Sequence, residues 1–206
     1  MARIILTLLA IAASCSPLAA APLSVRVVDA SGRPVRDAVV TLYPAAAARA
    51  PRPGGRYVIA QEHLQFHPFL TVVPVGADVS FPNLDPTKHH VYSFSPAKRF
   101  ELKLFAKDQS RTVHFDKPGV VALGCNIHDG MSAFIFVTDT VWTARTNGQG
   151  MAVFADAPNG AGRIDVWHPY LRAPGAMVQQ ALAAGQHAAS FSIRLRPPPS
   201  MPMMDY

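Results

Sequence analysis

Short segments in which apolar and polar residues alternate, separated by turns rich in glycine and proline, are the feature that most constrains this fold. The first two segments are Ser24–Asp29 and Ala38–Tyr43, with the turn Ala30–Pro34 between them. Alternation with a period of two indicates β-strands with one buried face. Helical periodicity is nearly absent, and only Ala176–Ala184 favours a helix. The sequence therefore predicts an all-β chain, as do its 19 prolines and 13 glycines in 206 residues.

Further strands are expected along the rest of the chain, with turn residues between them at short intervals. They cover Tyr57–Ala60, Phe69–Pro74, Asp78–Phe81, His90–Phe94, Phe100–Phe105, Arg111–Phe115, Gly119–Leu123, Ala133–Val137, Met151–Phe154, Arg163–Trp167 and Ala189–Leu195. Many short strands at this spacing are typical of a β-sandwich or a β-barrel.

The first residues, Met1–Ala21, have the three parts of an export signal. Arg3 supplies a positive charge, Ile4–Ala13 is apolar, and Ser16–Ala21 ends in small residues that suit cleavage after Ala20. The apolar run is too short to span a bilayer as an anchor. We therefore expect export to the periplasm; an uncleaved anchor and lipidation at Cys15 are the alternatives.

Removal of the signal leaves Cys125 as a lone thiol, because the sequence has two cysteines and the other is Cys15. One thiol cannot form an internal disulfide, and an unpaired thiol is a liability in an oxidising compartment. Cys125 is therefore expected to be buried and inert, bound to a metal, or reactive.

Cys125 begins a short run of metal-binding side chains that continues with His128 and Met131. A thiolate, an imidazole and a weakly bound thioether suit copper, and a trigonal copper site needs one more imidazole. His89, at the start of a strand, is the candidate for it, and His90 is the alternative. Because neighbouring strand residues face opposite sides, the two histidines are not expected to share one metal. Structural roles, a buried thiol for Cys125 and core packing for Met131, are the competing interpretation.

These motifs resemble those of the cupredoxin family. The spacing C-x2-H-x2-M in GCNIHDGM is similar to the ligand loop of amicyanins, and FPNLDPTKHHV resembles the strand that carries the first histidine in amicyanin- and plastocyanin-like proteins. The resemblance extends over Val58–Asp139 and also includes cupredoxin-like proteins labelled as methylamine utilisation proteins. It implies a Greek-key β-sandwich in which His89, Cys125 and His128 are equatorial ligands and Met131 is the axial ligand of one type 1 copper ion.

Two positions add detail to this resemblance. His90 stands where cupredoxins usually have asparagine, so His90 remains an alternative ligand. Asn83, at the end of the preceding strand, is expected to hydrogen-bond the backbone around the cysteine loop.

The flanking segments resemble a different kind of β-sandwich. VRVVDASGRPVRDAVVTLYP and TNGQGMAVFADAPNGAGRIDVWHP are similar to the carboxypeptidase regulatory-like, transthyretin-like or immunoglobulin-like sandwich. We therefore expect an N-terminal strand pair in 22–57, a cupredoxin-like copper domain in 58–139 and C-terminal strands in 140–196. The N-terminal and C-terminal strands are expected to pair with each other, with the copper domain between them in the sequence. Residues 197–206 are expected to be a disordered tail rich in methionine and proline.

The functional prediction is a periplasmic blue-copper protein that transfers single electrons and is not an enzyme. Its expected partner, implied by the resemblance, is a c-type cytochrome or a quinoprotein dehydrogenase. The enzyme motifs G-x-S-x-G and H-E-x-x-H do not occur. The formal net charge is +6, but the basic residues form no continuous run of the kind that indicates nucleic-acid binding. No apolar run after the signal is long enough to span a membrane. The alternatives are a copper chaperone or storage module and a metal-free structural β-sandwich.

Overall fold

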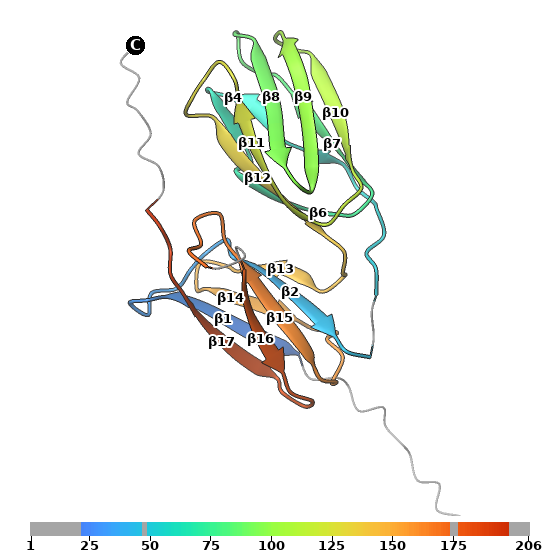
Figure 1. Ribbon diagram of the computed structural model, residues 1–206, viewed down its shortest axis with the longest axis vertical. Helices are drawn as coiled ribbons and strands as arrows, with labels where there is room; N and C mark the ends of the chain where they lie inside the picture. Colours follow the sequence, from blue (N-terminus) through green and yellow to red (C-terminus); the bar gives the residue numbers. More distant parts are fainter. Residues whose placement is uncertain (1–21, 47–48, 174–176, 198–206) are drawn as a thin grey trace, which may run out of the picture.

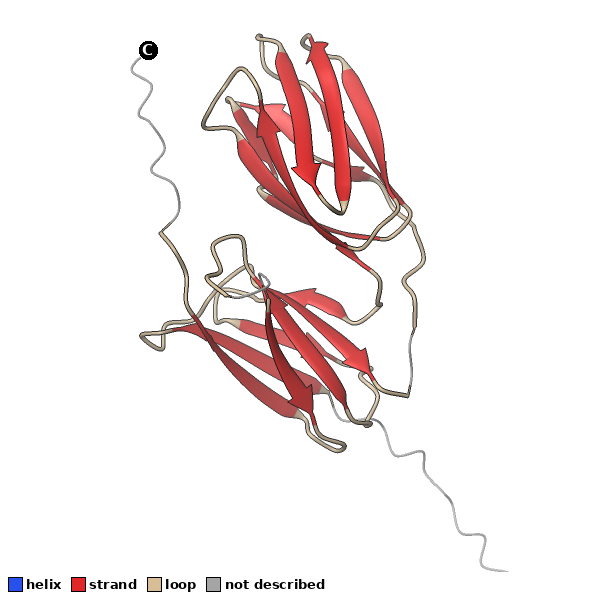
Figure 2. Cartoon of the chain, in the orientation of Figure 1, coloured by secondary structure: helices blue, strands red, loops and turns tan. Residues whose placement is uncertain are grey.

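The computed structural model describes residues 22–46, 49–173 and 177–197. The expected signal peptide and all of the expected tail except Pro197 lie outside the described residues. Within them every helix or strand element is a β-strand (Figure 2), which confirms the prediction of an all-β fold. The described residues contain no helix with the length and apolar character needed to cross a membrane.

Strands from the two ends of the described chain form one lobe, called here the flanking lobe, which occupies the lower part of Figure 1. Its strands are β1 (Leu23–Asp29), β2 (Val39–Pro44), β13 (Thr143–Arg145), β14 (Met151–Phe154), β15 (Gly162–Trp167), β16 (Val178–Leu182) and β17 (Ala188–Ile193). They form two sheets, in the orders β14-β1-β17 and β13-β2-β15-β16. Alternating side chains such as Val25 on β1 and Ile164 on β15 are fully buried in the core of this lobe.

Strand β16 corrects the expectation that Ala176–Ala184 favours a helix. Val178–Leu182 is a β-strand that pairs antiparallel with β15, with Gln180 opposite Ile164. Val178 and Leu182, at its two ends, pack against the core of the flanking lobe. Helix propensity is a weak preference, and here pairing with a neighbouring strand overrides it.

The middle of the chain forms a second lobe, called here the middle lobe. Its strands are β3 (Tyr57–Val58), β4 (Ala60–Glu62), β5 (Gln65–His67), β6 (Leu70–Pro74), β7 (Ala77–Pro82), β8 (His89–Ser95), β9 (Lys98–Phe105), β10 (Ser110–Phe115), β11 (Gly119–Cys125) and β12 (Ser132–Thr138). A five-stranded sheet of order β6-β12-β11-β8-β9 and a three-stranded sheet of order β10-β7-β3 contribute the buried Phe81, Phe115 and Ile135 to one core.

A short hairpin, β4–β5, is an element that the sequence did not predict. The single strand expected at Tyr57–Ala60 is divided, so that β3 ends at Val58 and β4 begins at Ala60. The hairpin turn consists of His63 and Leu64, which both have a φ of 54°. A bridge between Gln61 and Asn83 connects the hairpin to the end of β7.

The two lobes contact each other through a separate apolar cluster. Val39 and Trp167 of the flanking lobe pack with Leu70 and Phe136 of the middle lobe. The Trp167 ring lies 5.7 Å from the Phe136 ring, centroid to centroid. Leu70 lies on β6 and Phe136 on β12, so this part of the five-stranded sheet contacts the flanking lobe.

Candidate metal centre

Strands β8 and β11 are neighbours in the five-stranded sheet, and they bring His89 and Cys125 together. Cys125 pairs with Val91 on β8, two residues after His89. His89 is fully buried, whereas the ring of His90 faces the other side, with its Nε2 atom 2.9 Å from Glu101 Oε1. The structure therefore places His89, and not His90, beside the thiol.

The loop that follows Cys125 folds back on itself and so positions His128. The Met131 amide donates a hydrogen bond of 3.0 Å to the His128 carbonyl, and the Cys125 amide donates one of 3.3 Å to the Met131 carbonyl. At the start of the loop, the Asn126 amide donates to the His90 carbonyl at 3.1 Å. The loop is thereby attached both to itself and to β8.

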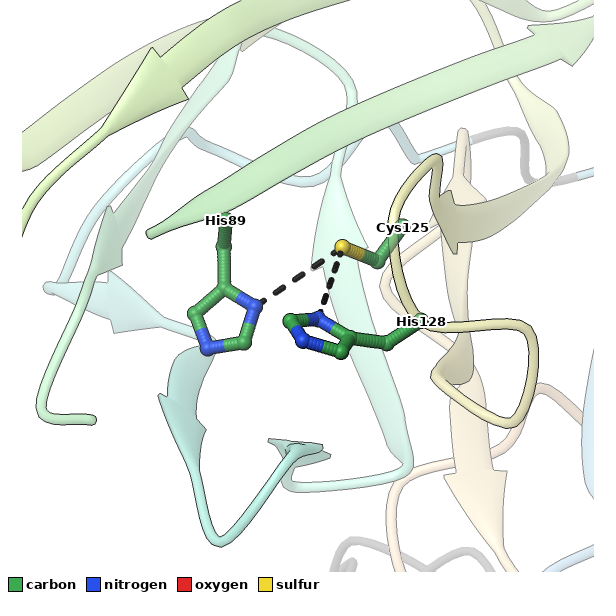
Figure 3. A group of neighbouring side chains, drawn as sticks. All are labelled: His89, Cys125 and His128. Carbon is green, nitrogen blue, oxygen red and sulfur yellow. Dashed lines mark hydrogen bonds between the residues drawn. The ribbon is translucent and has the colours of Figure 1, made fainter. Parts of the chain in front are cut away.

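Three side chains converge at this point (Figure 3). The Cys125 sulfur lies 3.7 Å from His89 Nδ1 and 3.6 Å from His128 Nδ1. One donor atom from each residue lies within 4.8 Å of the other two. Cys125 is buried and His128 is half-buried, so the cluster lies just inside the surface.

The distances and the donor types fit a first-row metal ion. Bonds of about 2.0 Å to nitrogen and about 2.3 Å to sulfur, set about 120° apart, separate the two donor atoms by about 3.7 Å. The sulfur-to-nitrogen distances of 3.7 and 3.6 Å match this trigonal spacing. Two imidazoles with one thiolate in a trigonal arrangement are characteristic of copper electron-transfer sites.

The fourth predicted site residue, Met131, lies in the same apolar cluster as Cys125. Its side chain is 2% exposed, and its backbone closes the loop around the site. This position is compatible with an axial thioether and equally with core packing, so its role as a ligand stays a prediction.

Asp85 is a residue of the site that the sequence analysis missed. Its Oδ2 atom lies 2.8 Å from His89 Nε2, the ring nitrogen on the side away from Cys125. Burial alone would raise the pKa of Asp85, but hydrogen bonds from His89 and from the backbone amides of Leu64 and His63 outweigh it and hold this pKa below its usual value. The signal available in the sequence was an acidic residue in the loop just before His89.

Asn83 makes different hydrogen bonds from the ones expected. Its side-chain amide donates hydrogen bonds to the carbonyls of Thr87, at 2.8 Å, and of Phe105, at 3.1 Å, and its Oδ1 atom accepts one from the Asp85 amide at 2.9 Å. The predicted contact with the cysteine loop is not among these bonds. Asn83 instead fixes the loop that leads into His89.

The electrostatic surroundings favour a neutral His128. Burial is the largest cause that lowers its pKa and the neighbouring His89 lowers it further, while Asp85 opposes these effects. A neutral imidazole is the form that binds a metal ion.

The other histidines are scattered, as the sequence suggested. Among the described His, Cys, Asp and Glu residues, His89, Cys125 and His128 are the group whose donor atoms lie close enough together to share a metal ion. His114 makes an exposed pair with Asp78, its Nδ1 atom 2.8 Å from Oδ1. Apart from His89, His90 and His128, the histidines of the chain are His63, His67, His114, His168 and His187.

Comparison with known proteins gives matches among solved structures. No model of a protein family matches the chain, and no curated protein sequence matches it. The reduced Cu(I) form of an amicyanin variant matches 48% of this chain and 98% of its own, with 20% identity and a TM-score of 0.38. A purple cupredoxin from Nitrosopumilus maritimus matches 40% of this chain and 99% of its own, with 19% identity and a TM-score of 0.36.

A larger protein also matches the chain. A copper-containing nitrite reductase from Thermus scotoductus SA-01 has 21% identity and a TM-score of 0.41 over 48% of this chain. The match spans about a quarter of that protein, 26% of its length. In all three comparisons the similarity covers about half of this chain or less.

Proposed function

We propose that this protein is an exported copper protein that carries single electrons, with one ion held by His89, Cys125, His128 and Met131. The observation that carries the proposal is the position of two Nδ1 atoms, 3.7 and 3.6 Å from one buried sulfur. A soft thiolate with two imidazoles and a weak axial thioether is the ligand set of blue-copper sites. The proposed location is the periplasm, as the N-terminal sequence suggests.

In this proposal copper supplies a couple of Cu(II) and Cu(I), and the chain supplies a site of fixed shape. Strand β8 holds His89, and β11 holds Cys125. The hydrogen bonds of the loop keep His128 in place. The strands and the loop hold each donor atom in place without the metal. The site would therefore change little in shape between Cu(II) and Cu(I). Cys125 binds as the thiolate, so loading releases a proton.

His128 is the proposed point at which electrons enter and leave. It is half-buried, whereas His89 is 0% and Cys125 5% exposed. Ile127, the residue before it, is 46% exposed and offers apolar surface to a partner. A c-type cytochrome or a quinoprotein dehydrogenase is the proposed partner, and the protein acts as a carrier without a catalytic reaction of its own.

Voltammetry of the copper-loaded protein tests the proposal. We expect one reversible one-electron wave, and we expect the same wave from His114→Gln, a matched control because His114 belongs to an exposed pair with Asp78. Copper binding without a reversible wave would identify a storage or chaperone module instead. Failure to bind copper would leave a structural β-sandwich.

A further inference from the structure

The unexpected hairpin β4–β5 contacts the metal centre through Asp85. Asp85 Oδ1 accepts a hydrogen bond of 2.7 Å from the His63 amide, and its Oδ2 atom accepts one of 3.0 Å from the Leu64 amide. The same Oδ2 atom lies 2.8 Å from His89 Nε2. We propose that Asp85, held by the hairpin turn, is a positioning residue that keeps the His89 ring in the orientation and tautomer that a metal ion requires; this inference rests on the proposed function.

The turn is built to hold a carboxylate. His63 and Leu64 both have a φ of 54°, so two successive residues lie in the left-handed region and both of their amides donate to Asp85. Turns with consecutive inward amides form anion-binding concavities. Left-handed backbone is unfavourable for residues other than glycine, asparagine and aspartate, and the two hydrogen bonds to Asp85 offset that cost.

The hairpin and the Asp85 loop are joined at two further points. The Leu84 amide donates to the Gln61 carbonyl at 2.8 Å, and the buried Gln61 side chain donates to the Pro82 carbonyl at 3.1 Å. Asp85 itself is 5% exposed. Its carboxylate is therefore fixed from both sides before it meets the histidine.

The contact with Asp85 determines which nitrogen of His89 carries the proton. An ionised carboxylate only accepts hydrogen bonds, so the proton lies on Nε2 and the lone pair lies on Nδ1. Nδ1 is the atom that faces the Cys125 sulfur, at 3.7 Å. Because His89 is fully buried, solvent does not compete with Asp85 for its Nε2 atom.

The carboxylate also influences the balance between the two copper states. A histidine that donates to a carboxylate is a more basic ligand than a free one. Greater basicity and a nearby negative charge both stabilise Cu(II) relative to Cu(I). Asp85 is therefore expected to lower the reduction potential of the site.

The test is Asp85→Asn, with Asp78→Asn as the matched control. Asp78 also contacts a histidine, with 2.8 Å between Asp78 Oδ1 and His114 Nδ1, but this pair is exposed and outside the site. Asp85→Asn is expected to weaken copper binding by roughly 10- to 100-fold and to raise the reduction potential. The control is expected to change neither.

A second measurement uses metal-free protein and does not depend on copper. Nitrogen NMR of the His89 ring is expected to show the proton on Nε2 in the wild type and a larger fraction on Nδ1 in Asp85→Asn. A wild-type ring with its proton on Nδ1 would overturn the inference, even if the variant did not fold. An unchanged tautomer and an unchanged potential in a folded variant would also overturn it. Failure of the wild type to bind copper would contradict the proposed function, while the tautomer would still report on Asp85.

Discussion

The Cys125 thiol has two imidazole nitrogens beside it and one proton to share between them. The sulfur lies at nearly equal distances from the two Nδ1 atoms, 3.7 and 3.6 Å. A neutral thiol donates one weak hydrogen bond, so it serves only one of the two nitrogens; the other, where it also presents a lone pair, is left without a donor. A metal ion that replaces the thiol proton binds all three atoms. The arrangement of these residues therefore suits an ion better than a hydrogen-bonded thiol.

The roles of the two adjacent histidines give a prediction at the residue scale. His89→Gln removes a buried donor, whereas His90→Gln alters a ring that pairs with Glu101 on the other side of β8. We expect His89→Gln to abolish the visible absorption of the copper-loaded protein and His90→Gln to retain it. Loss of absorption in His90→Gln with retention in His89→Gln would contradict the assignment.

The meeting of His89, Cys125 and His128 was predictable from the sequence, but their orientation was not. Motif spacing gave Cys125, His128 and Met131 as candidates, and the start of the next strand gave His89, with His90 as the alternative. Asp85 escaped prediction because its importance depends on two amides from residues 63 and 64, in a hairpin that the sequence did not reveal. Contacts between segments about 20 residues apart are a property of the fold and not of a local pattern.

At the scale of elements, the turn between β13 and β14 ends at Gly150, which is held close to β1. Gly150 has a φ of 72°, and its carbonyl accepts a hydrogen bond of 2.8 Å from the Val27 amide. A Cβ atom at this position would collide with the Val27 carbonyl oxygen. The turn therefore requires glycine both for its backbone conformation and for its close approach.

Gly150→Ala is accordingly expected to destabilise the flanking lobe. Strain and overpacking of this kind cost about 1–3 kcal/mol in free energy of unfolding, measured by urea denaturation. Gly148→Ala, in the same turn, is the control, because a Cβ there would have no atom within 4 Å. Equal free energies of unfolding for the two variants would contradict this prediction, because they would show that the turn accommodates a Cβ atom at residue 150 without loss of stability.

Element types were predicted well where alternation was clear and poorly where pairing decided the outcome. Ser24–Asp29 and Arg163–Trp167 alternate, and both are strands in the structure. The Ala176–Ala184 segment favours a helix locally, yet Val178–Leu182 pairs with β15. The sequence of this segment alone does not show that β15 offers a strand to pair with.

At the scale of the whole molecule, Trp167 connects the two lobes. It is 5% exposed, and its ring packs against Phe134 and Phe136 of β12, with 5.7 Å between centroids in each pair. On the same side of the molecule, Arg145 Nη1 donates to the Leu70 carbonyl at 3.2 Å. The lobes thus share an apolar contact in addition to the two chain connections.

Trp167→Ala is expected to lower the free energy of unfolding by about 3–5 kcal/mol. We also expect the unfolding of the two lobes to separate into two transitions in urea, with the copper absorption lost in only one of them. Phe94→Ala is the control, since Phe94 is 75% exposed on β8. A single, unshifted transition in Trp167→Ala would contradict a coupling role for this contact.

Titration of the mature protein with Cu(II), followed by visible absorption, tests the central claim most directly. With Cys125, His89 and His128 around one ion, we predict an intense band from charge transfer between thiolate and copper, saturating at one equivalent. Cys125→Ser, which replaces a soft sulfur by a hard oxygen, is predicted to lack the band. Absence of the band in the wild type, or its persistence in Cys125→Ser, would contradict the account.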